Sequence, residues 1–245
     1  MTGRAMALIL IGLDDTDNAT SRGTGHLARE LSAECERRGL RPRGVTRHQF
    51  LVDPRIPYTS HNSGACIAVE GDGGAGAAEF AFEFVAGRAA DGSDPGVCVA
   101  ASEAVPPEVA SFGRAAGCRI VEMDEALTLA RRAGLTLRPL GGTGLGVIGA
   151  LAAVGLRADG NDGRYIDLPG LRELSERVTV AALEGLGIRI EHPTDGRRAT
   201  EADAYETLGW VRPQLVEGGP VLPVEWSEEH YAWIPVDRRR HPSRR

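Results

Sequence analysis

Ala7-Leu-Ile-Leu-Ile-Gly-Leu-Asp14-Asp15-Thr16-Asp17 joins an unbroken apolar run to a cluster of aspartates, and this combination indicates how the fold begins. A continuous run of branched apolar residues is typical of a strand that is buried on both faces. The apolar residues Leu27, Leu31 and Cys35 then recur every four positions and predict a helix over 26–38. The chain therefore opens with a strand, an acidic loop and a helix.

The alternation of strands and helices continues along the chain. We predict strands at 97–101, 119–123 and 135–140, and helices at 107–117 and 124–134. Residues 80–90 fit either type of element. Strands that alternate with helices of this length predict an α/β fold, and an α+β arrangement fits as well.

A change of composition after residue 157, where Asp159-Gly-Asn-Asp-Gly163 forms a loop, marks a soft domain boundary. We expect residues 1–157 to form a catalytic region that binds nucleotide and Mg²⁺ and is not necessarily continuous. Residues 158–245 then form a smaller C-terminal region, with helices predicted at 171–186 and 201–208.

All 28 basic residues are arginines, which excludes a Schiff-base lysine, a lysine general base and the lysine of a P-loop. The net charge of −6 lacks the basic footprint of a nucleic-acid-binding protein, apart from the arginine-rich segment 238–245. A charged terminus is more often simply solvated.

The four cysteines form no C-x-x-C pair, which excludes a zinc ribbon or a redox dithiol and favours a reducing compartment. No apolar stretch approaches the ~20 residues of a membrane span. We therefore expect a soluble, cytoplasmic protein that does not contact a membrane.

Asp14, Asp15 and Asp17 follow the first strand directly, at the edge where open α/β sheets place their ligands. Three carboxylates so close together repel one another unless a cation neutralises them, and Mg²⁺ with substrate phosphates is the natural occupant. The three aspartates are therefore the candidate metal ligands and catalytic residues. The alternative is an ordinary exposed turn.

Gly23-Thr24-Gly25 leads into the first predicted helix, whose free amide groups favour an anion. We take both glycines as candidate phosphate-binding residues and Thr24 as a candidate catalytic residue that contacts a phosphoryl group. A loop of this composition before a helix is also commonplace.

A second group of polar candidates lies around a proline-rich loop. Arg47 and Asn62 are candidate binding residues, and His61 is a candidate general acid or base. A loop histidine can equally be structural or simply exposed.

Gly142, Gly144 and Gly146 precede an apolar helix and form a second candidate phosphate or substrate loop. The loop lacks the lysine of a Walker A motif, and the alternative is a turn that allows close helix packing.

Three separated segments resemble the isoleucine-tRNA 2-agmatinylcytidine synthetase family. They are Ile11-Gly-Leu-Asp-Asp-Thr-Asp-Asn18, Asp53-Pro-Arg-Ile-Pro-Tyr-Thr-Ser-His-Asn-Ser-Gly-Ala65 and Gly142-Thr-Gly-Leu-Gly-Val-Ile-Gly-Ala-Leu-Ala-Ala-Val-Gly155. Tyr165 also looks like part of the family's following segment, so the resemblance covers roughly residues 7–170.

The resemblance implies a kinase-like α/β domain with a ferredoxin-like second domain, which use ATP to activate a tRNA cytidine for attack by agmatine. It places Asp14, Asp15 and Asp17 at the magnesium and phosphate site, and Thr24 near a threonine pair of the ATP site. The family's loop cations are replaced by Thr59, Ser60 and His61. The OB-fold and zinc ribbon that bind tRNA in the family are not matched.

These observations predict an ATP- and Mg²⁺-dependent phosphotransfer or ligase-type enzyme that activates a small-molecule or nucleoside acceptor. Such reactions need mainly positioning and charge neutralisation, which arginines, backbone amides and a metal supply. A tRNA substrate would need a separate RNA-binding partner. The alternative is a catalytically silent module that binds a nucleotide or another ligand.

Overall fold

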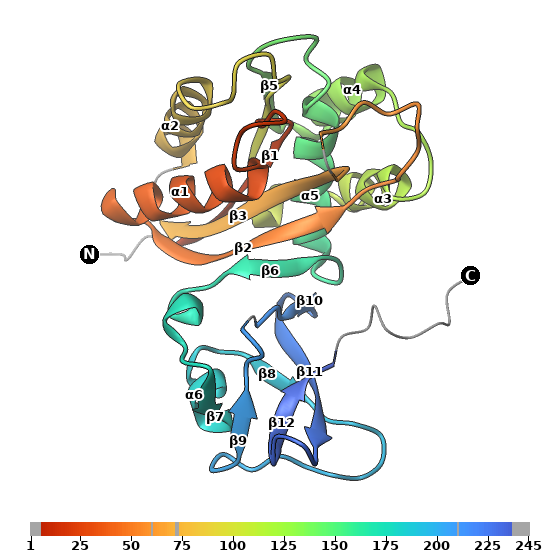
Figure 1. Cartoon of the computed structure of the whole chain (residues 1–245). Helices are drawn as coiled ribbons and strands as arrows, with labels where there is room; N and C mark the ends of the chain where they lie inside the picture. The colour runs from red at the N-terminus through yellow and green to blue at the C-terminus, as the bar shows by residue number, and fades with distance from the viewer. Residues whose placement is uncertain (1–5, 60, 72–73, 210, 237–245) are drawn as a thin grey trace.

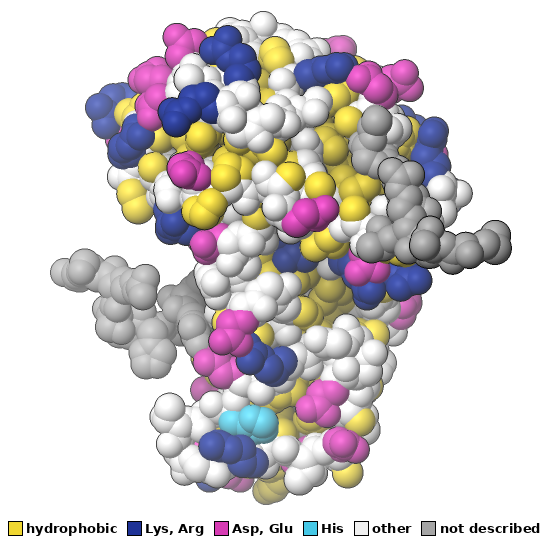
Figure 2. Space-filling view, turned by 180° about the vertical axis from the view of Figure 1, so that it is seen from behind, with side chains coloured by type: hydrophobic (Ala, Val, Ile, Leu, Met, Phe, Trp, Pro, Cys, Tyr) yellow, Lys and Arg dark blue, Asp and Glu magenta, His cyan; other side chains and the backbone are white. Residues whose placement is uncertain are grey.

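The computed structural model describes residues 6–59, 61–71, 74–209 and 211–236 of the chain. Ser60 and the arginine-rich segment 238–245 lie outside the described residues. Figure 1 shows a larger part that holds the N-terminal elements and a smaller part that holds the C-terminal strands. Seen from behind in Figure 2, acidic and basic side chains are mixed over the surface of both parts.

The larger part contains six strands, five α-helices and a short 3₁₀ turn among the described residues. In chain order these are β1 (Ala7–Asp14), α1 (Thr24–Arg37), β2 (Arg41–Gln49), β3 (Ser63–Gly71), α2 (Gly74–Ala86), β4 (Gly96–Ala101), η1 (Ser102–Ala104), α3 (Pro107–Ala116), α4 (Met123–Ala133), β5 (Thr136–Pro139), α5 (Val147–Asp159) and β6 (Arg164–Asp167).

The strands of this part lie in the order β5-β4-β1-β3-β2-β6, and each pair of neighbours is antiparallel. The mixed α/β fold class is confirmed, in its α+β form. The first six elements run β-α-β-β-α-β with the strand order β4-β1-β3-β2, which is the ferredoxin-like arrangement. The sequence analysis expected Asp14, Asp15 and Asp17 at the ligand-binding edge of an open α/β sheet. In the structure both neighbours of β1 are antiparallel to it, so no such parallel-sheet crevice forms there.

Strand β1 is buried on both faces, as its apolar run predicts. Ile9, Ile11 and Leu13 belong to the core beneath α1 and α2, while Leu10 belongs to the core beneath α3, α4 and α5. Gly12 allows α5 to approach closely, because a Cβ there would lie only 2.2 Å from the Ala150 carbonyl oxygen. The sheet is thus covered by helices on both faces (Figure 1).

The smaller part has its own core, in which the largest side chains are Tyr165, Tyr205 and Trp233. Its elements are η2 (Leu171–Glu173), β7 (Arg177–Thr179), α6 (Val180–Gly185), β8 (Arg189–Glu191), β9 (Ala204–Glu206), β10 (Gln214–Val216), β11 (Gly219–Ser227) and β12 (Ala232–Pro235). Strand β6 pairs with both β2 and β10 and so joins the two parts. The domain division at residue 157 stays a prediction.

Three predicted elements are wrong. No strand forms at 119–123, because Glu122 caps α4 together with Glu125. The helix predicted at 171–186 is only the short α6, because the Thr179 side chain accepts a hydrogen bond from the Ala182 N–H and starts the helix there. The helix predicted at 201–208 is strand β9.

Transmembrane helices were sought only among the described residues, and none of their helices combines the length and the apolar character that a bilayer span requires.

Candidate functional site

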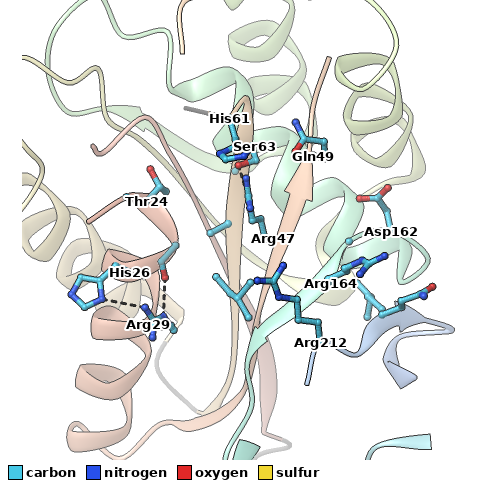
Figure 3. A pocket seen from close by; sticks show the side chains of 18 of the residues that line it. Thr24, His26, Arg29, Arg47, Gln49, His61, Ser63, Asp162, Arg164 and Arg212 are labelled. Atoms are coloured by element: carbon cyan, nitrogen blue, oxygen red, sulfur yellow. Dashed lines mark hydrogen bonds between the residues drawn. The ribbon is translucent and has the colours of Figure 1, made fainter. Parts of the chain in front are cut away.

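A cavity of about 840 Å³ lies between the N-terminus of α1, strands β2 and β3, and the chain around β6 and β10. Figure 3 shows Thr24, His26 and Arg29 on one side of this cavity and Asp162, Arg164 and Arg212 on the other. The cavity is therefore built where the two parts of the chain meet.

Half of the candidate site residues line this cavity, and half do not. Those that line it are Asp17, Gly23, Thr24, Gly25, Arg47 and His61. Those that do not are Asp14, Asp15, Asn62, Gly142, Gly144 and Gly146.

Thr24 is the first residue of α1, and its hydroxyl is held by three hydrogen bonds. It donates to Asp17 Oδ1 at 2.8 Å, and it accepts from the Thr16 backbone N–H at 3.2 Å and from the Thr16 hydroxyl at 3.1 Å. Gly23, before it, has φ = 88° and provides no side-chain cap. Residues 23–26 at the start of α1 line the cavity beside this fixed threonine, and the His26 N–H donates to the Gly23 carbonyl at 2.9 Å. The first amide groups of a helix otherwise have no partner within it.

Among the residues that the structure describes, six arginines line the cavity, and only Arg47 of them was a predicted binding residue. The others are Arg22, Arg29, Arg164, Arg172 and Arg212. Burial and the neighbouring charges of Arg172 and Arg22 lower the pKa of Arg29, while the carboxylates of Asp167 and Glu30 oppose this shift. Such a concentration of arginines on a chain of net charge −6 favours a ligand with several negative charges.

Arg29 could have been predicted from the sequence, because it lies one helical turn after Gly25 in the predicted helix. In the structure its Nε donates to the Gly25 carbonyl at 3.3 Å. Arg164 and Arg212 carry no local signal. Only the pairing of β6 with β2 and of β10 with β6 brings their segments to the cavity.

The candidate residues of β2 and of the polar loop before β3 have two different roles. The Asn62 amide donates to the Leu51 carbonyl at 2.7 Å and therefore ties the loop together. Arg47 Nε donates to the Ser63 hydroxyl at 2.9 Å on the cavity wall, next to His61 (Figure 3). Asn62 is thus placed to support the cavity, whereas Arg47 and His61 are placed to reach a ligand.

Asp14, Asp15 and Asp17 remain close together but turn toward different neighbours. Asp14 lies against α5, since a Cβ on Gly149 would come within 1.8 Å of Asp14 Oδ2, and burial raises its pKa to about 7. Burial and the nearby carboxylate of Asp94 raise the pKa of Asp15. Asp17 alone of the three lines the cavity.

The donors near the cavity fit Mg²⁺ only in part. Among the residues that the structure describes, no group of three or more histidine, cysteine or acidic side chains is arranged to hold a metal. Mg²⁺ usually takes one or two carboxylates and completes its shell with phosphate oxygens and water. Asp17, with Asp15 nearby, meets this smaller requirement.

The loop that contains Gly142, Gly144 and Gly146 packs against the segment just before β4. The Thr143 N–H and hydroxyl both donate to the Asp94 carboxylate, and a Cβ on Gly146 would lie 2.3 Å from the Asp94 carbonyl oxygen. These contacts are those of a turn that allows close packing of α5, which is the alternative that the sequence left open for Gly142, Gly144 and Gly146.

Comparison with known proteins gives one consistent relationship. No family model matches the sequence. The chain is 31% identical over 156 residues to the isoleucine-tRNA 2-agmatinylcytidine synthetase TiaS of Methanocorpusculum labreanum, a match that covers 62% of this chain and 36% of that protein.

Solved structures show the same similarity. A complex of TiaS with an isoleucine tRNA and ATP matches with 29% identity and a TM-score of 0.54, over 61% of this chain and 36% of that chain. A complex of TiaS with the tRNA, AMPCPP and agmatine matches with 27% identity and a TM-score of 0.54, with the same coverage. The resemblance seen in the sequence is confirmed, and the chain spans little more than a third of the length of these relatives.

Proposed function

We propose that this chain is an ATP-dependent phosphotransfer or ligase-type enzyme that binds ATP in the arginine-lined cavity. The match to TiaS, which covers 62% of the chain, supports this proposal. The acceptor that it activates is a small molecule or a nucleoside.

One observation carries this proposal: the first residues of α1 and several arginines line the same cavity. The Gly23–Gly25 turn supplies backbone amides, and Arg22 and Arg29 flank it. Helix N-termini and guanidinium groups both bind phosphate without lysine. A triphosphate at this turn would lie beside Thr24 and Asp17.

The chain's own residues position the phosphates. Thr24, fixed by its bonds to Thr16 and Asp17, holds the turn in one geometry. Bound Mg²⁺ would neutralise charge on the phosphates, with Asp17 and Asp15 as the ligands that we propose. Arg47 and His61 line the same cavity between its two sides (Figure 3), where His61 is a candidate to carry a proton to or from the acceptor.

The solved TiaS complexes contain an isoleucine tRNA, and one also contains agmatine. For this chain we propose a small acceptor, and we propose that tRNA takes part only with a separate RNA-binding partner. A net charge of −6 gives little general attraction for a polyanion outside the cavity. A cytoplasmic location stays part of the proposal.

A catalytically silent nucleotide-binding module is the second candidate. It is favoured by the replacement of the family's loop cations with Thr59, Ser60 and His61. A module that only senses a nucleotide needs the arginines and the α1 turn but not the aspartates.

A thermal melt with and without Mg-ATP, run beside analysis of the nucleotide products, tests both candidates. A ligand at ~100 times its Kd stabilises by about 2.7 kcal/mol, which is a shift of several degrees. Arg29→Ala should abolish the shift. The control Arg138→Ala should not, because Arg138 pairs with Glu79 away from the cavity.

The outcomes separate the candidates. A shift with release of ADP or AMP supports the enzyme, and loss of product formation in Asp17→Asn with binding retained would support a role for the carboxylate in turnover. A shift without products in any acceptor mixture supports the silent module. No shift at millimolar Mg-ATP would refute nucleotide binding.

A further inference from the structure

The strand pairing places two arginines directly opposite each other where they line the cavity. Arg47 of β2 is the cross-strand partner of Arg164 of β6, and both side chains are half-buried. Directly opposed residues of an antiparallel pair have Cβ atoms ~4.5–5.5 Å apart, and like charges in such a pair destabilise the sheet. An anion bound beside both guanidinium groups relieves this repulsion.

A third strand extends the same surface with more hydrogen-bond donors. Gln214 of β10 is the partner of Arg164 on its other side, and Arg212 lies two residues before Gln214. The Tyr165 N–H donates to the Pro213 carbonyl at 2.8 Å and so holds this segment against β6. All four polar side chains line the cavity, and we call them the arginine wall: Arg47, Arg164, Arg212 and Gln214.

The arginine wall carries a net positive charge. Among the described residues that line the cavity, the carboxylates are Asp17, bonded to Thr24, and Asp162, on the side of the wall. Asp162 also lies 3.0 Å from Nδ1 of the buried His48. Three guanidinium groups and one carboxylate leave the wall positive whichever pairs form within it. This excess favours an anion and disfavours a cationic amine.

The wall is distinct from the turn where the phosphates of ATP are proposed to bind. Figure 3 shows Arg164 and Arg212 across the cavity from Thr24 and Arg29, with Arg47 between these two sides. The cavity volume of about 840 Å³ is near the upper end of the ~300–1,000 Å³ that ligand pockets span. The cavity therefore has room for a small second ligand beside a nucleotide.

We propose that the arginine wall binds a carboxylate or phosphate group of the acceptor, and that the acceptor of this chain is a small anion. This inference rests on the proposed function, which places the nucleotide phosphates at the Gly23–Gly25 turn and leaves the wall to the second substrate. The planar fork of a guanidinium bonds to two oxygens of a carboxylate or phosphate at once. The acceptor is then opposite in charge to the agmatine of one solved TiaS complex.

Two pairs of probes measure the charge preference of the wall. Succinate is compared with its uncharged diamide, succinamide, and glycerol 3-phosphate is compared with glycerol. Each is titrated by calorimetry into the full chain with a non-hydrolysable Mg-ATP analogue present. We expect at least one anion to bind tenfold or more tightly than its uncharged counterpart, and agmatine to bind no better than succinamide. The pair with the larger preference distinguishes carboxylate from phosphate.

Substitutions in the wall separate its charge from its shape. Arg164→Gln and Arg212→Gln should each weaken binding of the preferred anion about tenfold or more and leave binding of its uncharged counterpart unchanged. Arg164→Lys keeps the charge but loses the fork, so its affinity should lie between those of the wild type and Arg164→Gln. The matched control Arg197→Gln should bind like the wild type, because Arg197 pairs with Glu228 and does not line the cavity.

Three results would overturn the proposal. The first is an anion affinity no higher than that of the uncharged counterparts or unchanged in both glutamine variants. The second is competition between the anion and the nucleotide analogue, which would assign the wall to the nucleotide. The third is tighter binding of a five-nucleotide oligouridylate than of either small anion, lost in Arg164→Gln, which would assign the wall to RNA.

Titration of the nucleotide analogue alone is read separately. If the analogue fails to bind, the proposed function fails, whereas the preference for an anion and its loss in Arg164→Gln still decide whether the arginine wall is an anion site.

Discussion

Replacing Asp14 by asparagine should stabilise the folded protein at neutral pH and leave its stability at pH 4 unchanged. Burial raises the pKa of Asp14 from 3.8 to about 7, and the like charges of Asp15 and Asp17 add to this effect. Because the folded state holds the proton more tightly than the unfolded state, the wild-type protein loses stability as the pH rises from ~4 to ~7. The asparagine side chain has the same shape and does not ionise.

The size of the effect follows from the shift. A pKa raised by about 3 units corresponds to about 4 kcal/mol, at ~1.4 kcal/mol per unit. Asp14 is only partly buried, and screening by solvent reduces the penalty to about 2 kcal/mol. For a chain of this size that is an increase in Tm of roughly 4–8 °C at pH 8.

Urea unfolding of both proteins between pH 4 and pH 8 measures the difference directly. Asp53→Asn, followed down to pH 2, is the matched control with the opposite sign, since Arg55 holds the pKa of Asp53 at about 2. That variant should be less stable than the wild type at neutral pH, and the difference should be lost only as the pH falls from ~4 to ~2. A stability difference for Asp14→Asn that does not change between pH 4 and pH 8 would show that Asp14 does not have a raised pKa in the folded protein.

Two further substitutions test the packing and the α1 turn. Gly12→Ala should destabilise by ~3 kcal/mol or more in urea unfolding, because its Cβ would meet the Ala150 carbonyl at 2.2 Å, whereas Gly76→Ala meets nothing within 4 Å and should be neutral or slightly stabilising. Thr24→Val keeps the shape but loses the bond to Asp17, so we expect a loss of about 1–2 kcal/mol and weaker Mg-ATP binding by calorimetry. Equal stability of the two alanine variants, or unchanged nucleotide affinity in Thr24→Val, would contradict these expectations.

The elements that could be predicted from the sequence are those whose pattern is local. The apolar run of β1 and the four-residue spacing of Leu27, Leu31 and Cys35 predict a strand and a helix that the structure contains. Strand direction has no such local signature. β3 lies between β1 and β2 and is antiparallel to both. This position depends on contacts between strands that are distant in the sequence.

The candidate site could be predicted only where one short segment builds it. Gly23, Thr24 and Gly25 share a turn with Asp17, so their proximity follows from the sequence alone. Arg164 and Arg212 reach the same cavity from distant segments through the pairing of β6 and β10. The pattern of residues 141–146 was ambiguous because glycine serves both close packing and anion binding.

A crystal structure of the chain with a non-hydrolysable ATP analogue and Mg²⁺ would show whether ATP binds in the arginine-lined cavity. We expect the triphosphate at the Gly23–Gly25 turn, with phosphate oxygens bonded to the backbone amides of α1 and to Arg29. A triphosphate bound at the Gly141–Gly146 loop, or outside the cavity, would contradict this expectation.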